Sequence, residues 1–327
     1  MARRSSWRAL GAVGLALLGA GCEAGDRPDT LALATAGTGG VYYVLGGALS
    51  ERWSAALPDH QVVAEVTGGS VENLNLLLAG EVDVAFSMGT TAYQAHHGTG
   101  PFEGRPEGEV RALAALYPNA LHLVVAEGSE IRSVDDLRGR RVSVGAPGSG
   151  TEGAARILLE ANGLDYDDLR PQRLNFNETA NALRDGTVDA GFWSVGPPTS
   201  SLVDLATARD VRLVPIRGEE AERAAELDPT LRRFIIEAGT YPGQEDDVET
   251  VSTPNVLVVR SDFPTEVARG LVRFLLEARE SLEGVHPVAR SITVDYTLSD
   301  TPIPLHAGVV RHLEEEGETV PERLVAH

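Results

Sequence analysis

Hydrophobic and polar residues follow the same pattern in two stretches of the chain that lie 106 positions apart. Residues 72–87 read ENLNLLLAGEVDVAFS, and residues 178–194 read ETANALRDGTVDAGFWS. In each stretch, the apolar positions recur near the helical period, the predicted helix ends at a glycine, and a short apolar strand follows. A repeated helix–glycine–strand unit predicts two similar α/β lobes, and a small ligand is expected in the cleft between such lobes.

The rest of the chain alternates between apolar segments of strand length and amphipathic segments of helix length. This alternation predicts an α/β fold with mostly parallel sheets and helices on both faces. The expected strands are 31–35, 61–67, 82–87, 110–116, 121–126, 141–146, 171–176, 211–216 and 253–260, and the expected further helices are 41–57, 152–162, 218–238, 264–282 and 305–316. Tyr117-Pro118-Asn119 separates two strands and is the first hinge candidate. We expect residues 30–118 and 261–327 to form the first lobe and residues 119–260 the second.

The first 22 residues are expected to lie outside the fold. A basic segment is followed by an apolar run that is too short to span a bilayer, which is typical of an export signal. The run ends at Cys22, the only cysteine of the protein. The preceding Gly19-Ala20-Gly21 resembles a bacterial lipobox, with glycine where leucine is usual. We therefore expect a signal peptide over 1–22, lipid attachment at Cys22, a tether over 23–29, and a location in the periplasm or at the cell surface. The alternative is an ordinary secretory signal that is cut nearby.

Composition narrows the possible functions. A net charge of −20 argues against binding to nucleic acid or to anionic lipid. The chain contains no lysine, which excludes a Walker lysine and a Schiff-base lysine. It has no G-x-S-x-G nucleophile elbow, and its eight histidines show no spacing typical of metal ligands. The sequence therefore predicts no catalytic residues, no metal and no cofactor.

Three glycine-rich turns each follow a predicted strand and precede a predicted helix, at residues 38–40, 68–70 and 148–151. Glycine lets the backbone approach a ligand closely, and a helix N-terminus offers free N–H groups and the positive end of a dipole. In open α/β sheets, such turns lie at the carboxyl ends of strands, where ligands bind. Together the turns predict a site for a small carboxylate.

The third turn has an alternative interpretation. Residues 148–153 match the pattern G-x-G-x-x-G after a strand, with Asp165, Asp167 and Asp168 further along. This arrangement is that of a dinucleotide-binding fingerprint. An exported enzyme that uses a dinucleotide therefore stays open as an alternative.

Aromatic side chains lie near the same turns. Tyr42 and Tyr43 follow the first turn, and Trp193 lies at the end of the second repeat strand. A tyrosine or tryptophan at such a position covers a ligand and donates one hydrogen bond. We expect Trp193 and one of the two tyrosines to contact the ligand. Phe86 and Phe192 are expected in the core, and Ser87 and Ser194 are further candidate donors.

Several long motifs resemble those of one known family. TAGTGGVYYVLGG, EVTGGSVENLNLL, DLRGRRVSVGAPGSGTEGAARILLEANG, DGTVDAGFWSVGPPTS, AGTYPGQEDDVETVSTPNVLVV and IPLHAGVVRHLEEEG resemble the TAXI family of solute-binding proteins. This family serves TRAP (tripartite ATP-independent periplasmic) transporters. The resemblance extends from about residue 30 to the C-terminus. It implies the type II periplasmic-binding-protein fold, in which two α/β lobes enclose a ligand cleft and are joined by a β-strand hinge.

The resemblance also implies a function and a set of ligand contacts. The ligand would be a small organic acid or amino acid, such as a glutamate-like carboxylate, and it would be delivered to a TRAP permease driven by an ion gradient. The implied contacts are Gly40, Tyr42 or Tyr43, Gly69, Ser70, Asn73, Gly148, Ser149, Gly150, Thr151 and Trp193. These motifs contain no obvious site arginine, so backbone N–H groups and hydroxyls would meet the carboxylate. A binding-fold protein that presents a ligand to a sensor is a further alternative.

Overall fold

The computed structural model describes residues 29–105 and 108–326. The predicted signal peptide, the lipid-attachment site Cys22 and residues 23–28 of the predicted tether lie outside the described residues. Within the described ranges, no helix combines the length and the apolar character needed to cross a membrane.

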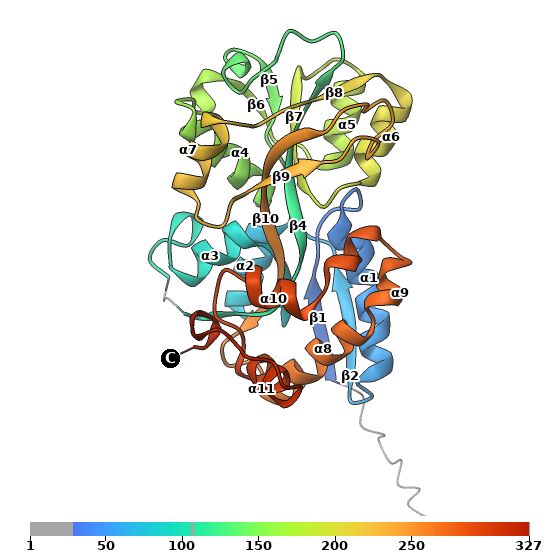
Figure 1. The fold of residues 1–327 in the computed structure, drawn as a ribbon, viewed down its shortest axis with the longest axis vertical. Helices are drawn as coiled ribbons and strands as arrows, with labels where there is room; N and C mark the ends of the chain where they lie inside the picture. Colours follow the sequence, from blue (N-terminus) through green and yellow to red (C-terminus); the bar gives the residue numbers. More distant parts are fainter. Residues whose placement is uncertain (1–28, 106–107, 327) are drawn as a thin grey trace, which may run out of the picture.

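The helices and strands gather into two lobes joined by two long strands, as Figure 1 shows. The first lobe contains β1 (Asp29–Ala34), α1 (Val41–Ala56), β2 (His60–Glu65), α2 (Ser70–Ala79), β3 (Val84–Met88), α3 (Gly89–His96), α8 (Thr265–Glu277), α9 (Arg279–Glu283), α10 (Val294–Asp300) and α11 (Ala307–Glu315). The second contains β5 (Arg141–Ser143), α4 (Gly150–Ala161), β6 (Arg170–Gln172), α5 (Phe176–Arg184), β7 (Ala190–Val195), α6 (Ser200–Ala208), β8 (Val211–Val214), α7 (Glu219–Leu227) and β9 (Arg232–Ile236). Strands β4 (Val110–Ala126) and β10 (Val248–Arg260) run through both lobes.

The strands form one mixed sheet in the order β2-β1-β3-β10-β4-β7-β5-β6, with β8 paired to β4 and β9 paired to β10. The expectation of mostly parallel sheets is wrong, because the two connecting strands run antiparallel to all their neighbours. The outer strands of each lobe are parallel to one another. The order β2-β1-β3-β10 in one lobe matches β6-β5-β7-β4 in the other, so the repeated unit predicted from the sequence is present.

The repeated Val-Asp pair has the same structural role in both lobes. A carboxylate oxygen of Asp83 accepts a hydrogen bond from the Ala32 N–H at 2.8 Å, and the Asp83 N–H donates to the Ala32 carbonyl at 3.0 Å. Asp189 makes the same two bonds with Arg141, at 2.8 and 2.7 Å. Each aspartate therefore fastens the strand of its own repeat to the central strand of its lobe.

Other repeated residues fix the ends of the repeat helices. Gly80 and Gly186 follow α2 and α5 with φ of 73° and 69°, a left-handed conformation that glycine adopts without strain. Glu72 and Glu178 each accept a hydrogen bond from a backbone N–H just before their helix, at 2.8 and 2.9 Å. The residues that recur in the sequence therefore make the same helix caps and the same strand-to-strand hydrogen bonds in both lobes.

The alternating residues of β4 serve two core layers in the second lobe. Leu121, Leu123 and Val125 belong to the cluster that contains residues of α4 and α7. Ala120 and Val124 belong to the larger cluster, which contains residues of α5 and α6 and continues through the first lobe. Strand β4 therefore carries a continuous core from one lobe to the other.

The structure corrects several predicted boundaries. β4 is continuous across Tyr117–Asn119, so the predicted break is wrong. Pro118 lies opposite Pro254 of β10, and a proline is tolerated in a strand where its missing N–H is not needed by the ladder. The segment 218–238 is not wholly helical, because α7 ends at Leu227 and β9 then pairs with β10. The structure adds α3, α6 and α10, which the pattern did not predict.

Strand β10 crosses from the second lobe to the first lobe within its own length. Residues Asn255 to Val258 pair with β3 of the first lobe, whereas Val248 to Ser252 pair with β9 of the second. The chain therefore enters the sheet of the first lobe before Arg260.

Candidate ligand-binding site

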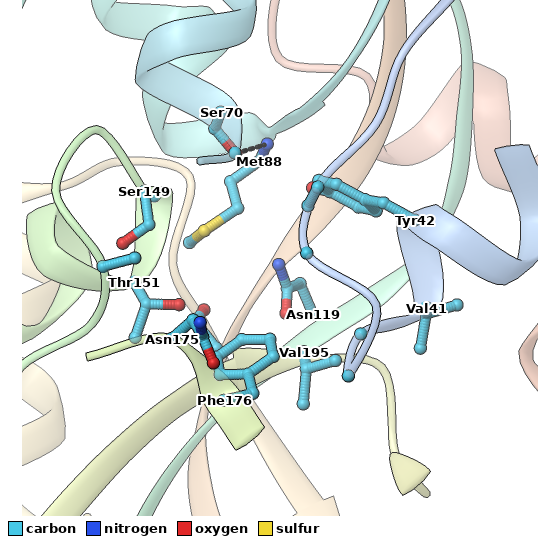
Figure 2. A pocket seen from close by; sticks show the side chains of 18 of the residues that line it. Val41, Tyr42, Ser70, Met88, Asn119, Ser149, Thr151, Asn175, Phe176 and Val195 are labelled. Carbon is cyan, nitrogen blue, oxygen red and sulfur yellow. Dashed lines mark hydrogen bonds between the residues drawn. The ribbon is translucent and has the colours of Figure 1, made fainter. Parts of the chain in front are cut away.

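A cavity of about 100 Å³ lies between the two lobes (Figure 2). Its walls are the turns that follow β1, β2, β5 and β6 and lead into α1, α2, α4 and α5, and its remaining surface comes from β4, β10 and the ends of β3 and β7. The lining residues are Ala36–Tyr42, Gly68–Ser70, Met88, Tyr117, Asn119, Ala146, Ser149–Thr151, Asn175–Asn177, Ser194–Gly196 and Asn255. The cavity thus lies at the carboxyl ends of the parallel strands, where open α/β sheets bind ligands.

Four helix N-termini converge on this cavity. The residues that precede the first turns of α1, α2, α4 and α5 are Gly40, Gly69, Ser149 and Asn175, and all four line it. Each helix presents the positive end of its dipole and N–H groups that have no partner within the helix. Among the described residues, those that line the cavity include no charged side chain and no histidine. Any positive potential at this lining therefore comes from backbone groups, not from cationic side chains.

The N-terminus of α2 is already occupied by the other lobe. The carbonyl of Gly148 accepts hydrogen bonds from the N–H groups of Val71 and Glu72, both at 3.1 Å. The first helical residues of α4 and α5, which include Thr151 and Phe176, line the cavity instead. The N-termini of these two helices of the second lobe therefore face the cavity, as does that of α1 in the first lobe.

The two lobes touch one another across the cleft. The Thr199 hydroxyl donates to the Gly39 carbonyl at 3.0 Å, and the Asn177 amide donates to the Thr38 hydroxyl at 3.3 Å. A Cβ atom added to Gly150 would lie 2.4 Å from the sulfur of Met88. A side chain at position 150 would have to displace Met88 of the first lobe, so the two lobes are in contact here and the structure has the cleft closed.

The two connecting strands, β4 and β10, supply buried polar side chains to the cavity. Asn255 accepts hydrogen bonds at its side-chain oxygen from the Tyr42 hydroxyl and, at 2.9 Å, from the Asn119 amide. The Tyr117 hydroxyl, the Asn119 Oδ1 and the Asn255 Nδ2 are buried and have no hydrogen-bond partner within residues 29–105 and 108–326. Burial raises the pKa of the Tyr42 and Tyr117 phenols, so both side chains are neutral at physiological pH.

Aromatic packing fixes two lining side chains. The Phe176 ring stacks on Trp193, with ring centroids 6.3 Å apart and an interplanar angle of 22°. The Tyr42 ring stacks on Phe86, with centroids 4.9 Å apart. Figure 2 shows Phe176, Asn119 and Tyr42 around one space. The apolar part of the cavity is thus held in place by buried rings behind it.

Most of the residues implied by the sequence lie around this cavity. Gly40, Tyr42, Gly69, Ser70, Ser149, Gly150 and Thr151 line it. Ser70 also accepts a hydrogen bond from the Met88 N–H at 3.0 Å (Figure 2), and Ser149 accepts from the Glu152 N–H at 3.2 Å. These two hydroxyls therefore also fix the backbone at the cavity wall.

Four implied residues lie outside the lining: Tyr43, Asn73, Gly148 and Trp193. Tyr43 is exposed, so the structure selects Tyr42 of the two tyrosines as the cavity residue. Asn73 is fully buried and donates to the Thr35 and Phe86 carbonyls at 2.7 and 2.8 Å, which ties β1 to β3. Gly148 contacts α2 through its carbonyl, as described above.

Trp193 is buried on the face of β7 that α6 covers. Its indole N–H donates to the Ser201 hydroxyl at 3.2 Å. Successive residues of a strand point to opposite faces, and Phe192 accordingly lies in the core on the other side. Trp193 was expected to contact the ligand directly, but Phe176 lines the cavity in its place, and the Trp193 ring packs against the Phe176 ring.

The sequence reasoning missed two groups of lining residues. Asn175 precedes α5 and corresponds to Gly69 at the repeat offset of 106, so the repeat itself contained the signal for a fourth turn. Tyr117, Asn119 and Asn255 belong to strands that are otherwise apolar. Their signal was a Pro-Asn pair in each strand, with Pro118 and Pro254 in register.

The acidic residues that a dinucleotide site would need, Asp165, Asp167 and Asp168, lie in a turn and in the short helix that it caps. Asp165 caps a short 3-10 helix (Tyr166–Asp168), where its side chain accepts from two backbone N–H groups. Asp168 forms an ion pair with Arg138. The cluster precedes β6 and does not follow it, whereas the fingerprint needs an acid at the end of a strand. This geometry does not fit the dinucleotide interpretation.

Comparisons with known proteins agree with this architecture. The model of the NMT1-like family matches residues 33–317. The alkanesulfonate-binding protein SsuA from Xanthomonas axonopodis pv. citri, bound to MOPS, has a TM-score of 0.51 at 16% identity over 91% of this chain and 96% of that chain. A putative L-cystine ABC transporter from Listeria monocytogenes has a TM-score of 0.52 at 15% identity over 82% and 98%. A binding protein component of an ABC phosphonate transporter from Pseudomonas aeruginosa has a TM-score of 0.52 at 13% identity over 80% and 79%. At such low identity the likeness shows the fold alone, and it confirms the predicted periplasmic-binding-protein fold.

Proposed function

The chain belongs to the NMT1-like family, and from this premise we propose that it is an extracytoplasmic receptor for a small organic acid or amino acid. The observation that carries the proposal is the closed cavity on which helix N-termini from both lobes converge, those of α1, α4 and α5 among them. Backbone N–H groups at helix N-termini bind carboxylates without any cationic side chain. The cavity is smaller than the roughly 300–1,000 Å³ of sites for drug-sized ligands, so it suits a small molecule.

The TAXI-like motifs extend the proposal to delivery. We propose that the loaded receptor hands its ligand to the membrane subunits of a TRAP permease, and that a lipid on Cys22 keeps it at the membrane. Closure would move the first lobe against the second, with bending near the facing Pro118 and Pro254 of the two connecting strands.

Within the cavity, we assign the main anion contact to the turn of residues 148–151. Gly150 and Thr151 open α4, a twelve-residue helix, and both line the cavity. The Thr151 hydroxyl points toward the same space in Figure 2. A carboxylate there would accept charge-assisted hydrogen bonds, which are roughly twice as strong as neutral ones.

Calorimetry of the purified protein against small carboxylates and amino acids tests the function. We expect at least one to bind with a dissociation constant of about 1 μM or tighter, which corresponds to roughly −8 kcal/mol. Thr151→Val removes one hydroxyl and is expected to weaken that binding by about tenfold. Thr187→Val, on an exposed turn of the second lobe, is the matched control and should bind normally. Absence of heat with every carboxylate and amino acid of three to six carbons would contradict the proposal.

Transport tests the delivery step separately. Proteoliposomes that contain a TRAP permease pair should take up labelled ligand only when the receptor and an ion gradient are both present. Binding without any such uptake would leave the receptor function intact and would favour the alternative in which the closed protein presents its ligand to a sensor.

A further inference from the structure

Three buried polar atoms on the connecting strands β4 and β10 lack hydrogen-bond partners among the residues that the structure describes. They are the Tyr117 hydroxyl, Asn119 Oδ1 and Asn255 Nδ2, and the three residues are 0%, 2% and 0% exposed. Native proteins rarely leave buried polar atoms unpaired, because each costs about 1–3 kcal/mol. All three residues line the cavity between the lobes, which makes a ligand the natural partner.

The three side chains are held side by side. Tyr117 and Asn119 are two positions apart on β4 and point to the same face, and Asn255 is the register partner of Tyr117 on β10. The Asn119 amide donates to the Asn255 side-chain oxygen at 2.9 Å, so the two amides are in direct contact. The Tyr42 hydroxyl donates to the same Asn255 oxygen and so also fixes this side chain.

The pair of amides offers one free donor and one free acceptor in either orientation. When the Asn119 amide donates to the Asn255 oxygen, Asn119 Oδ1 is free to accept and Asn255 Nδ2 is free to donate. If both amides are turned over, Asn255 donates to Asn119 and to Tyr42, which leaves an oxygen on Asn255 and an NH₂ group on Asn119. A ligand group that donates and accepts at once satisfies both atoms, and a hydroxyl or a primary carboxamide does so.

Charge argues against the other common polar groups. An ammonium group needs an anion or several acceptors when it is buried, and the lining described by the structure contains no carboxylate. The convergent helix N-termini would also repel it. A second carboxylate beside these amides would meet one free amide oxygen in either orientation, and that oxygen repels an anion. It would also find no cationic side chain among the described lining residues.

We propose that Tyr117, Asn119 and Asn255 form an inner subsite that recognises an uncharged hydroxyl or carboxamide group of the ligand. The carboxylate of the same ligand then faces the N-termini of α4 and α5. This inference rests on the proposed receptor function and narrows it: the ligand is a small monocarboxylate with a neutral hydrogen-bonding group, and zwitterionic amino acids are rejected.

A matched set of probes tests the subsite by calorimetry on the purified full chain. The probes are 4-hydroxybutyrate and succinamate, which carry the expected groups, and pentanoate, 4-aminobutyrate and succinate, which carry a methyl, an ammonium and a second carboxylate. We expect the hydroxyl or the carboxamide probe to bind at least about tenfold more tightly than the other three, because those leave the buried atoms unpaired. Which of the two binds better identifies the recognised group.

Tyr117→Phe tests the assignment of the subsite. The Tyr117 hydroxyl has no partner in the structure, so its removal is expected to leave thermal stability without ligand unchanged or higher. The same variant should reduce the preference for the favoured probe over pentanoate by about fivefold or more. Tyr241→Phe is the matched control: its hydroxyl bonds His122 at 2.9 Å outside the cavity lining, so this variant should lower stability and keep the preference.

Two results would overturn the inference. Equal binding of pentanoate, or tighter binding of 4-aminobutyrate or succinate, refutes the neutral subsite while leaving the receptor function supported. An unchanged preference in Tyr117→Phe together with Asn119→Leu refutes the assignment to these residues. If no probe binds and no other carboxylate or amino acid does, the receptor function itself fails.

Discussion

At the scale of single residues, His122 shows how burial sets the charge of a side chain near the hinge. It lies on β4 and is fully buried, with Nδ1 3.0 Å from the Ala120 carbonyl and Nε2 2.9 Å from the Tyr241 hydroxyl. The carbonyl needs a donor, so Nδ1 carries the proton and Nε2 accepts from the phenol. Burial lowers the pKa of His122 to about 4, and hydrogen bonds to the backbone of Ala120 and Trp193 oppose this only in part.

The depressed pKa predicts a loss of stability in mild acid. The unfolded chain binds a proton near pH 6.5, whereas folded His122 does so only near pH 4, so the unfolded state gains protons first as the pH falls. The free energy of unfolding is expected to fall by about 2 kcal/mol from this residue between pH 7 and pH 5. Urea denaturation at the two pH values measures it, and His122→Gln should remove that share. Burial also lowers the pKa values of His286 and His306. Both residues are present in the two proteins, so their contribution cancels in the difference between the wild type and the variant. An equal pH dependence in the two proteins would contradict the assignment.

Gly150 gives a second prediction at this scale, which concerns closure. Its φ is not in the left-handed region, so the reason for glycine is space. An added Cβ would lie 2.4 Å from the Met88 sulfur and 2.8 Å from the Ser70 hydroxyl, both across the cleft. Gly150→Val is expected to weaken ligand binding at least tenfold, or about 1.4 kcal/mol, with little change in the free energy of unfolding.

Gly153→Val is the control for that experiment. The same substitution is then made in the same helix at a position where an added Cβ meets nothing within 4 Å. Calorimetry should show normal binding for Gly153→Val. Equal binding by both variants would show that the turn before α4 does not contact the other lobe when ligand is bound.

At the scale of elements, the repeated aspartates predict a stability effect. Asp83→Ala leaves the Ala32 N–H without its 2.8 Å acceptor at the junction of β1 and β3. We expect the free energy of unfolding to fall by about 1–3 kcal/mol. Glu130→Ala is a suitable control, because Glu130 is 88% exposed and its pair with Arg140 is 3.5 Å long. That control should change the free energy of unfolding by less than about 0.5 kcal/mol. If Asp83→Ala lowers the free energy of unfolding by no more than the control does, Asp83 does not hold β3 to β1.

The elements that could be predicted from the sequence are those whose causes are local. The units that run from strand through glycine turn to helix are determined by neighbouring residues, and Gly40, Gly69 and Gly150 of these turns line the cavity. The continuity of β4 depends on a partner strand that is far away in sequence. Pro118 alone looks like a strand break, and only its pairing with Pro254 makes it compatible with the sheet.

The candidate site was predictable to the same extent and for the same reason. Tyr117 and Asn255 reach the cavity only because β4 and β10 pair there, a contact between residues that are far apart in the chain. Trp193 was misplaced because its direction depends on which face of β7 the helix α6 covers. A sequence pattern shows that a strand alternates, but the face that meets the ligand is decided by packing.

At the scale of the whole molecule, the closed cleft is held by bonds that exist only when the lobes meet. One is the bond from the Thr199 hydroxyl to the Gly39 carbonyl, 3.0 Å long and buried. In an open molecule, water would satisfy both groups. Removal of the hydroxyl therefore penalises the closed state alone, since the Gly39 carbonyl loses its partner only there.

Thr199→Val is accordingly expected to shift the lobes toward the open arrangement without unfolding either lobe. A penalty of about 1–3 kcal/mol on closure weakens ligand binding by roughly five- to 150-fold, because ligand binds to the closed form and must first recover that energy. Small-angle scattering should show a larger radius of gyration for Thr199→Val than for wild type at the same sub-saturating ligand concentration, and the two curves should converge when ligand is raised in proportion. Thr187→Val, whose hydroxyl bonds within its own lobe, should behave as wild type. If Thr199→Val binds and scatters like wild type, the bond to Gly39 does not hold the cleft, and closure depends on the ligand and the remaining contacts between the lobes.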